Sequence, residues 1–168
     1  MADTGFKTAA TEISDSWTSN MSPATLATSD NSRALATNTS YLGAVVEDFT
    51  FGIPAGSTVD GIEIAAEFSA SFAGVVASLE LSLSWDNGSN FTAVKEDTVT
   101  GNTDTTKTFG GATDTWGRAW SPDTEMVDGT FQVKVRGKAG TAGQSCRLDY
   151  MAIKVYYTLG GVMWVTIF

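Results

Sequence analysis

The stretch from Arg147 to Thr158 constrains the fold of this chain more than any other. Its apolar side chains alternate with polar ones, and a period of two is typical of a strand that buries one face. The residues on that face are Met151, Ile153, Val155 and Tyr157. β-branched and aromatic residues add strand propensity. We therefore expect this segment to be a main strand of a sheet, with the rest of the chain supplying its partners.

Similar alternation marks further segments, and turn residues separate them. The predicted strands are 33–37, 44–51, 58–69, 76–85, 91–96, 106–109 and 130–136, with a helical turn at 123–128. Residues 97–108 are predicted to be a long mobile loop apart from that short edge strand. The run Asp86–Ser89 is a strong hairpin signal, because Asn-Gly tolerates the positive φ that a tight turn demands.

These segments predict an all-β protein: a two-sheet antiparallel sandwich of the jelly-roll type with about eight strands. An immunoglobulin-like sandwich is the alternative. A length of 168 residues suits a single domain. Within it we distinguish an extended N-terminal arm with the first short strand (1–40), the sandwich (41–159) and an apolar, strand-like C-terminal tail (160–168). The arm is polar, and we expect it to wrap over the domain or to reach toward a neighbour.

Composition excludes several classes of function. The chain has no histidine, which removes the commonest general base and metal ligand, and its single Cys146 cannot form an internal disulfide or a thiolate cluster. The net charge of −9 argues against a nucleic-acid partner, which would require clustered Lys and Arg. No apolar stretch reaches the roughly 20 residues of a membrane helix, and the N-terminus lacks signal-peptide features. We expect no cofactor, no membrane partner and assembly in a cytoplasm.

Oxygen-bearing side chains offer two kinds of candidate chemical site, a carboxylate pair and a calcium site. Glu63 and Glu67 share a strand face and Glu80 is expected near them, so a glycosidase-like carboxylate pair is conceivable. A solvated strand face is the favoured interpretation. Oxygen-bearing residues for calcium are Asp86, Asn87 and Asn90, and Asp97, Asn102 and Asp104. Their spacing matches no calcium loop and turns select the same residues, so we predict no metal site and no enzyme.

Trp116 and Trp120 bracket a glycine and an arginine and have two interpretations. They would stack on a sugar if exposed, with loops 86–90, 97–108 and 137–145 completing a glycan site. Alternatively they plug one end of the sandwich or stack with Arg118. The structural role is favoured.

Several motifs occur in a fixed order along the chain. They are Trp17, Pro23, Asp30, 34–37, 49–64, Gly111, Trp116, Gly117, Trp120, 131–133, Asp149, Tyr150 and 155–158. Together they resemble β-sandwich modules of tailed-bacteriophage virion proteins, found in decoration, head-fibre and tail-associated chains. This resemblance implies a non-enzymatic capsid decoration (cement) protein that stabilises the head shell. It also implies a virion location, a homo-oligomer (a trimer by analogy), and the major capsid protein or other virion proteins as partners. The alternative is a glycan- or receptor-binding module of a tail or head fibre.

The chain departs from such modules after Thr158, where a hydrophobic stretch is added. One interpretation is an edge strand of its own sheet. The other is strand addition to another subunit or to the capsid. The predicted partner-binding residues are Val162, Met163, Trp164, Val165, Ile167 and Phe168.

Overall fold

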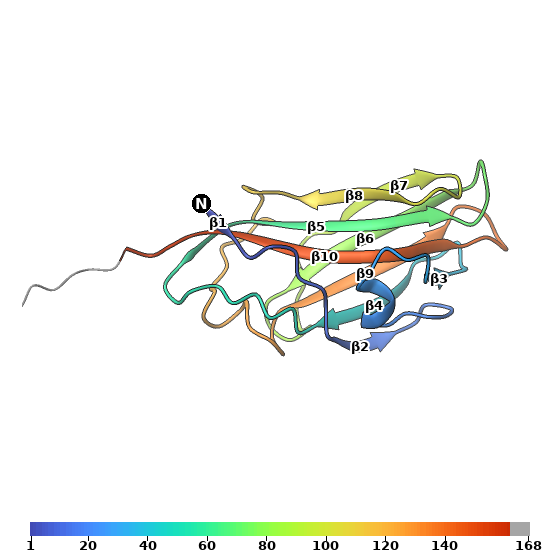
Figure 1. Ribbon diagram of the computed structural model, residues 1–168. Coiled ribbons are helices and arrows are strands. Elements are labelled where there is room, and N and C mark those ends of the chain that lie inside the picture. The colour runs from blue at the N-terminus through green and yellow to red at the C-terminus, as the bar shows by residue number, and fades with distance from the viewer. Residues whose placement is uncertain (162–168) are drawn as a thin grey trace, which may run out of the picture.

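The long C-terminal strand lies inside one of two antiparallel sheets that pack face to face (Figure 1). This computed structural model describes residues 1–161. Its elements are β1 (Ala2–Asp3), β2 (Thr11–Asp15), α1 (Pro23–Leu26), β3 (Ala34–Ala36), β4 (Leu42–Glu47), β5 (Thr58–Ala70), β6 (Val76–Ser84), β7 (Lys95–Thr100), β8 (Thr105–Gly110), β9 (Gln132–Ala139) and β10 (Cys146–Thr158).

The strand order is that of a jelly roll. One sheet runs β1-β10-β5-β8, with β3 also paired to β10, and the other runs β2-β4-β9-β6-β7. The eight strands from β3 to β10 therefore form two four-stranded sheets, β3-β10-β5-β8 and β4-β9-β6-β7, as in two interlocked Greek keys. β1 and β2 are additions at the edges. The predicted all-β jelly-roll sandwich is confirmed.

The core lies between the sheets and follows the period-two pattern. In the first sheet, Ile153 on β10 pairs with Ile64 on β5, and Val155 pairs with Ile62. All four side chains are fully buried. The opposite sheet contributes apolar side chains from β6 and β9, again at alternate positions: Leu79, Leu81, Leu83, Val133 and Val135. Each of these strands thus turns its large apolar side chains toward the core and places polar or small residues on the other face.

The polar N-terminal segment wraps over its own domain, one of the two arrangements expected. β1 lies along β10, and the Thr4 amide donates to the Val155 carbonyl at 3.1 Å. β2 lies along β4 in the other sheet. Trp17 and Leu26 are buried in the core. Residues 1–40 therefore belong to both sheets of the sandwich, and they cover strand edges that would otherwise present unpaired backbone groups.

Two polar strands differ from the prediction. The strand expected at 91–96 is β7, which begins at Lys95, and most of the predicted mobile loop 97–108 lies in β7 and β8. These edge strands bury only Val99 and Phe109, so they lack the apolar alternation that identified the inner strands. A helical turn is present but begins earlier than the predicted 123–128, since the Glu125 amide donates to the Ser121 carbonyl at 2.9 Å.

Candidate functional site

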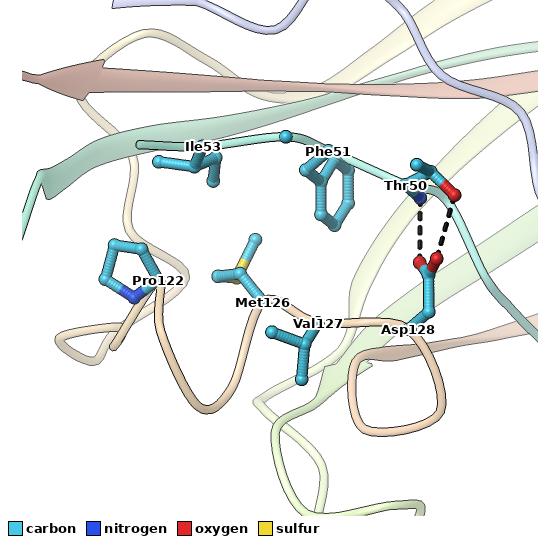
Figure 2. A pocket seen from close by; sticks show the side chains of 8 residues that line it. Thr50, Phe51, Ile53, Pro122, Met126, Val127 and Asp128 are labelled. Carbon is cyan, nitrogen blue, oxygen red and sulfur yellow. Dashed lines mark hydrogen bonds between the residues drawn. The ribbon is translucent and has the colours of Figure 1, made fainter. Parts of the chain in front are cut away.

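Two hollows among residues 1–161 are of a size to hold a small ligand, and the first lies between two loops at one end of the sandwich. We call it the loop-end pocket; it has a volume of about 270 Å³. Its lining residues are Thr50, Phe51, Gly52, Ile53, Pro122, Met126, Val127 and Asp128. Figure 2 shows Phe51 and Ile53 on one side of it and Pro122, Met126 and Val127 on the other.

The polar atoms of the loop-end pocket are bonded to each other. Both Asp128 carboxylate oxygens accept hydrogen bonds from Thr50, one from its backbone N–H and one from its hydroxyl, each at 2.8 Å (Figure 2). The neighbouring Gly129 N–H donates to Asp48 at 3.0 Å. Asp48 and Thr50 both have positive φ, at 62° and 49°, which these bonds help to hold. The pocket is a joint between two loops, and the Asp128 carboxylate and the Thr50 hydroxyl that line it are bonded to each other.

Beneath this joint an aromatic cluster closes the end of the sandwich. Phe131 packs edge-on against Phe49 and Phe51, with ring centroids 5.9 Å and 5.2 Å away. Trp120 lies against the same ring at 5.5 Å. Because such aromatic contacts bury large areas, this end of the molecule is part of the core.

The second hollow lies on the solvent-facing side of the sheet β2-β4-β9-β6-β7. We call it the sheet groove; it has a volume of about 350 Å³. Its lining residues are Ile13, Ser14, Val45, Asn87, Gly88, Phe91, Gln132 and Lys134. Val45 and Lys134 are direct cross-strand partners on β4 and β9. Since Val46 and Val133 next to them are buried in the core, Val45 and Lys134 project from the opposite face and form the floor.

One wall of the sheet groove is the predicted Asn-Gly turn. Asn87 and Gly88 have φ of 55° and 79°, as a type I′ turn requires, so the turn signal is confirmed. The turn folds onto Gln132, whose amide Nε2 donates to Asn87 at 2.6 Å and to Glu47 at 3.0 Å. A Cβ at Gly88 would lie only 2.7 Å from the Gln132 amide oxygen. Gln132 is thus locked, and it fixes the distance between the turn and the sheet.

The other wall is β2, which carries a bulge. Its pairing with β4 shifts register between Glu12 and Ser14, leaving Ile13 unpaired and 48% exposed. Bulges commonly redirect a side chain near a binding site. Ile13 from this wall and Phe91 from beyond the turn give the groove two apolar borders.

The groove floor also carries a cation. The Lys134 ammonium lies 3.6 Å from the centroid of the Phe91 ring. Burial, and secondarily the positive charge of Arg136, lowers the pKa of Lys134. Along the same strand, Arg136 pairs with Glu80 and Lys138 lies 4.0 Å from Glu96. Within residues 1–161, Lys134 has no carboxylate at ion-pair distance, so its charge is met only by the aromatic ring.

The two tryptophans predicted as sugar-stacking residues lie elsewhere, and both are buried. Trp116 and Trp120 are 5% and 6% exposed, and their indole N–H groups donate to backbone carbonyls of Ile62 and Thr115. Arg118 lies over the Trp120 ring at 4.6 Å, and Lys95 over the Trp116 ring at 5.1 Å. Because their rings are covered, these tryptophans cannot serve as a stacking platform, and the glycan-stacking assignment to them is wrong.

The acidic residues weighed from the sequence do not converge. Glu63 accepts a hydrogen bond from Tyr156 at 2.8 Å on the outer face of one sheet, whereas Glu80 pairs with Arg136 on the other sheet. The expected proximity of Glu80 to Glu63 is therefore wrong, because β5 and β6 belong to different sheets. In the described part of the chain, no three His, Cys, Asp or Glu side chains gather as a metal site would require.

Cys146 is fully buried at the start of β10. Burial raises the pKa of its thiol to about 12, since the core disfavours the thiolate. Such a thiol is unreactive in the folded protein.

The predicted partner-binding residues Val162–Phe168 lie outside the described residues. The structure describes a single chain, so it does not test the capsid partner, the trimer or the virion location. These three stay predictions. Among residues 1–161, no helix has the length and apolar character needed to span a bilayer.

Comparison with known proteins gives structural likeness alone. No family model and no curated protein matches this chain. TmCBM61 in complex with β-1,4-galactotriose is 12% identical, with 72% of this chain and 68% of that chain covered and a TM-score of 0.37. A structure described as CBM4 is 12% identical, with 89% and 93% covered and a TM-score of 0.39. The arabinose-bound α-L-arabinofuranosidase MgGH51 is 15% identical, with 73% of this chain but only 22% of the enzyme covered and a TM-score of 0.40. With identities of 12–15% and TM-scores of 0.37–0.40, these likenesses assign neither a ligand nor a role to this chain.

Proposed function

We propose that this protein is a non-catalytic glycan-binding module and that its ligand lies in the sheet groove. The observation that carries the proposal is the groove itself, an open hollow of about 350 Å³ on a solvent-facing sheet. This volume lies within the range of small-ligand sites, which combine apolar walls with a few well-placed polar groups. Glycan binding is the alternative function predicted from the sequence, but we place the site in the sheet groove instead of at Trp116 and Trp120.

The lining of the groove suits the two surfaces of a sugar ring. A pyranose has a face of C–H groups and a rim of hydroxyls. Phe91 and Ile13 offer apolar contact to the first. For the second, the Asn87 amide N–H groups, the Ser14 hydroxyl and the Lys134 ammonium have no hydrogen-bond partner within residues 1–161, so all three are available to hydroxyls.

The groove is also held in shape before any ligand arrives. Its floor is built on paired strands, and the Gln132 amide clamps the Asn87 turn against β4 and β9. Preorganisation of this kind reduces the entropy lost on binding. We therefore assign Gln132 a positioning role and Phe91 a contact role.

The test is binding of soluble polysaccharides and oligosaccharides by affinity electrophoresis and titration calorimetry, comparing Phe91→Ala with Phe72→Ala. Phe72 is 58% exposed in the loop before β6, at the opposite end of that strand from the groove. We expect saturable binding to at least one glycan, weakened at least about tenfold by Phe91→Ala and unchanged by Phe72→Ala. Both variants should keep the wild-type unfolding midpoint within about 0.5 M urea. Absence of binding to every glycan, or equal affinity of the two variants, would contradict the proposal.

A further inference from the structure

Three basic residues form a row along the solvent-facing side of β9. Lys134, Arg136 and Lys138 occupy alternate positions, so all three project from the same face of the sheet. Each lies over an aromatic ring, Lys134 over Phe91 and the other two over Tyr41. In a chain of net charge −9, this row is a local concentration of positive charge.

Two members of the row are already neutralised. Arg136 pairs with Glu80, which is its cross-strand partner on β6. Lys138 lies near Glu96, and the Tyr41 hydroxyl donates to the same carboxylate at 2.6 Å. These side chains form a closed network beside the groove.

Lys134 differs from them in its neighbours. Its cross-strand partners are Val45 and Ser82, which carry no charge. Two carboxylates lie two positions from these partners in the strand register, Glu47 on β4 and Glu80 on β6. Glu47 accepts a hydrogen bond from Gln132, and Glu80 pairs with Arg136. A half-buried ammonium that has lost part of its hydration without gaining an anion favours a ligand that supplies one.

This inference rests on the proposed glycan-binding function and names its ligand class. We propose that the sheet groove selects a sugar residue that carries an anionic group, a carboxylate or a sulfate ester, and that Lys134 binds this group. The sugar ring would lie between Ile13 and Phe91, with the Asn87 amide and the Ser14 hydroxyl directed at its hydroxyls.

The overall charge makes such selectivity easy to recognise. A protein of net charge −9 repels polyanions at long range, so nonspecific adhesion to acidic polymers is disfavoured. Tight binding of an acidic glycan would therefore arise from contacts inside the groove.

The experiment compares matched polymers with and without the anionic group. Polygalacturonate is paired with its methyl ester, hyaluronan with its carboxyl-reduced form, and dextran sulfate with dextran. The first two pairs test carboxylates and the third tests sulfate esters. Affinities are measured for the wild-type chain, Lys134→Gln and Lys138→Gln. The two variants lose the same charge from the same face of β9, but only Lys134 lines the groove.

We expect at least one anionic polymer to bind about tenfold or more tightly than its neutral partner. Lys134→Gln should remove most of this preference, and Lys138→Gln should retain it. An unchanged preference in Lys134→Gln, equal losses in both variants, or equal binding of charged and neutral polymers by the wild-type chain would overturn the inference while leaving glycan binding intact. If no glycan binds, charged or neutral, the proposed function fails as well.

Discussion

The loop-end pocket and the sheet groove are of similar size, about 270 and 350 Å³, yet their polar atoms are in opposite states. In the pocket, the Asp128 carboxylate is satisfied by Thr50, and core side chains form the walls. In the groove, the Gln132 amide has its hydrogen bonds within residues 1–161, but the Lys134 ammonium faces only the Phe91 ring. The groove lies on the outer face of a sheet. A hollow whose polar groups bond to one another stabilises the fold, whereas one with unsatisfied groups on a rigid floor has capacity for a ligand.

The comparison predicts that substitutions at the two hollows separate stability from binding. Loop-end variants should lower the free energy of unfolding and leave glycan affinity unchanged. Groove variants that keep the backbone conformation, such as Phe91→Ala, should weaken glycan affinity and leave the free energy of unfolding nearly unchanged.

The largest effect is expected from Phe131→Ala at the loop end. Phe131 is 1% exposed and contacts Phe49, Phe51 and Trp120, so its removal leaves a cavity in the aromatic cluster. Truncation of a buried Phe destabilises proteins by about 3–5 kcal/mol. Urea denaturation measures the loss, and Phe72→Ala at an exposed site is the control. A loss below about 1 kcal/mol would mean that the aromatic cluster does not hold this end of the sandwich.

The second prediction compares two glycines that share a backbone conformation. Gly88 and Gly74 have φ of 79° and 76°, so an alanine at either position should cost about 1 kcal/mol in backbone strain. At Gly74 an added Cβ meets nothing within 4 Å, whereas at Gly88 it meets the Gln132 amide oxygen at 2.7 Å. Gly88→Ala should therefore also displace the turn and weaken glycan binding several-fold. Equal glycan affinity of Gly88→Ala and Gly74→Ala would show that the turn does not shape the binding site.

These glycines also illustrate what the sequence could foretell. Residues with a local signature were predictable: the alternation in β5, β6, β9 and β10, and the Asn-Gly turn that became a wall of the groove. β7 and β8 were misplaced because their polar edges lack that alternation. The alternation on β9 also predicts that Lys134 projects from the face opposite to Val133 and Val135.

The groove itself was not predictable, because its members come from distant parts of the chain. Ile13, Val45, Gly88 and Lys134 become neighbours only through the order β2-β4-β9 and a turn that folds back over it. For Trp116 and Trp120 the favoured structural role agrees with the structure, because the loop 111–131 buries both indoles against the sandwich.

A smaller effect is expected from Asp128→Ala, which removes both bonds that hold Thr50. These bonds lie near the surface, so the loss should be about 1 kcal/mol in the free energy of unfolding. Thr50→Ser, which keeps the backbone N–H and the hydroxyl, is the matched control and should stay within about 0.5 kcal/mol. Glycan affinity should be unchanged in both variants. A weaker glycan affinity in Asp128→Ala would show that the two hollows are coupled.

The smallest effect on stability is expected from deleting Val162–Phe168, and it decides whether the loop end is purely structural. β10 ends at Thr158, and Gly160 lies against the Gly56 backbone in the loop that lines the pocket, so the last described residues lie beside that pocket. All pairing of β10 with β1, β3 and β5 is complete before Leu159, which is 60% exposed. We therefore expect the truncated chain to unfold within about 0.5 kcal/mol of the full chain. A loss above about 1 kcal/mol would instead favour an added strand in its own sheet.

If the predicted virion role is correct, the truncated chain should also fail to bind capsid shells while its glycan affinity stays the same. Shell binding that survives the deletion would contradict docking through the tail.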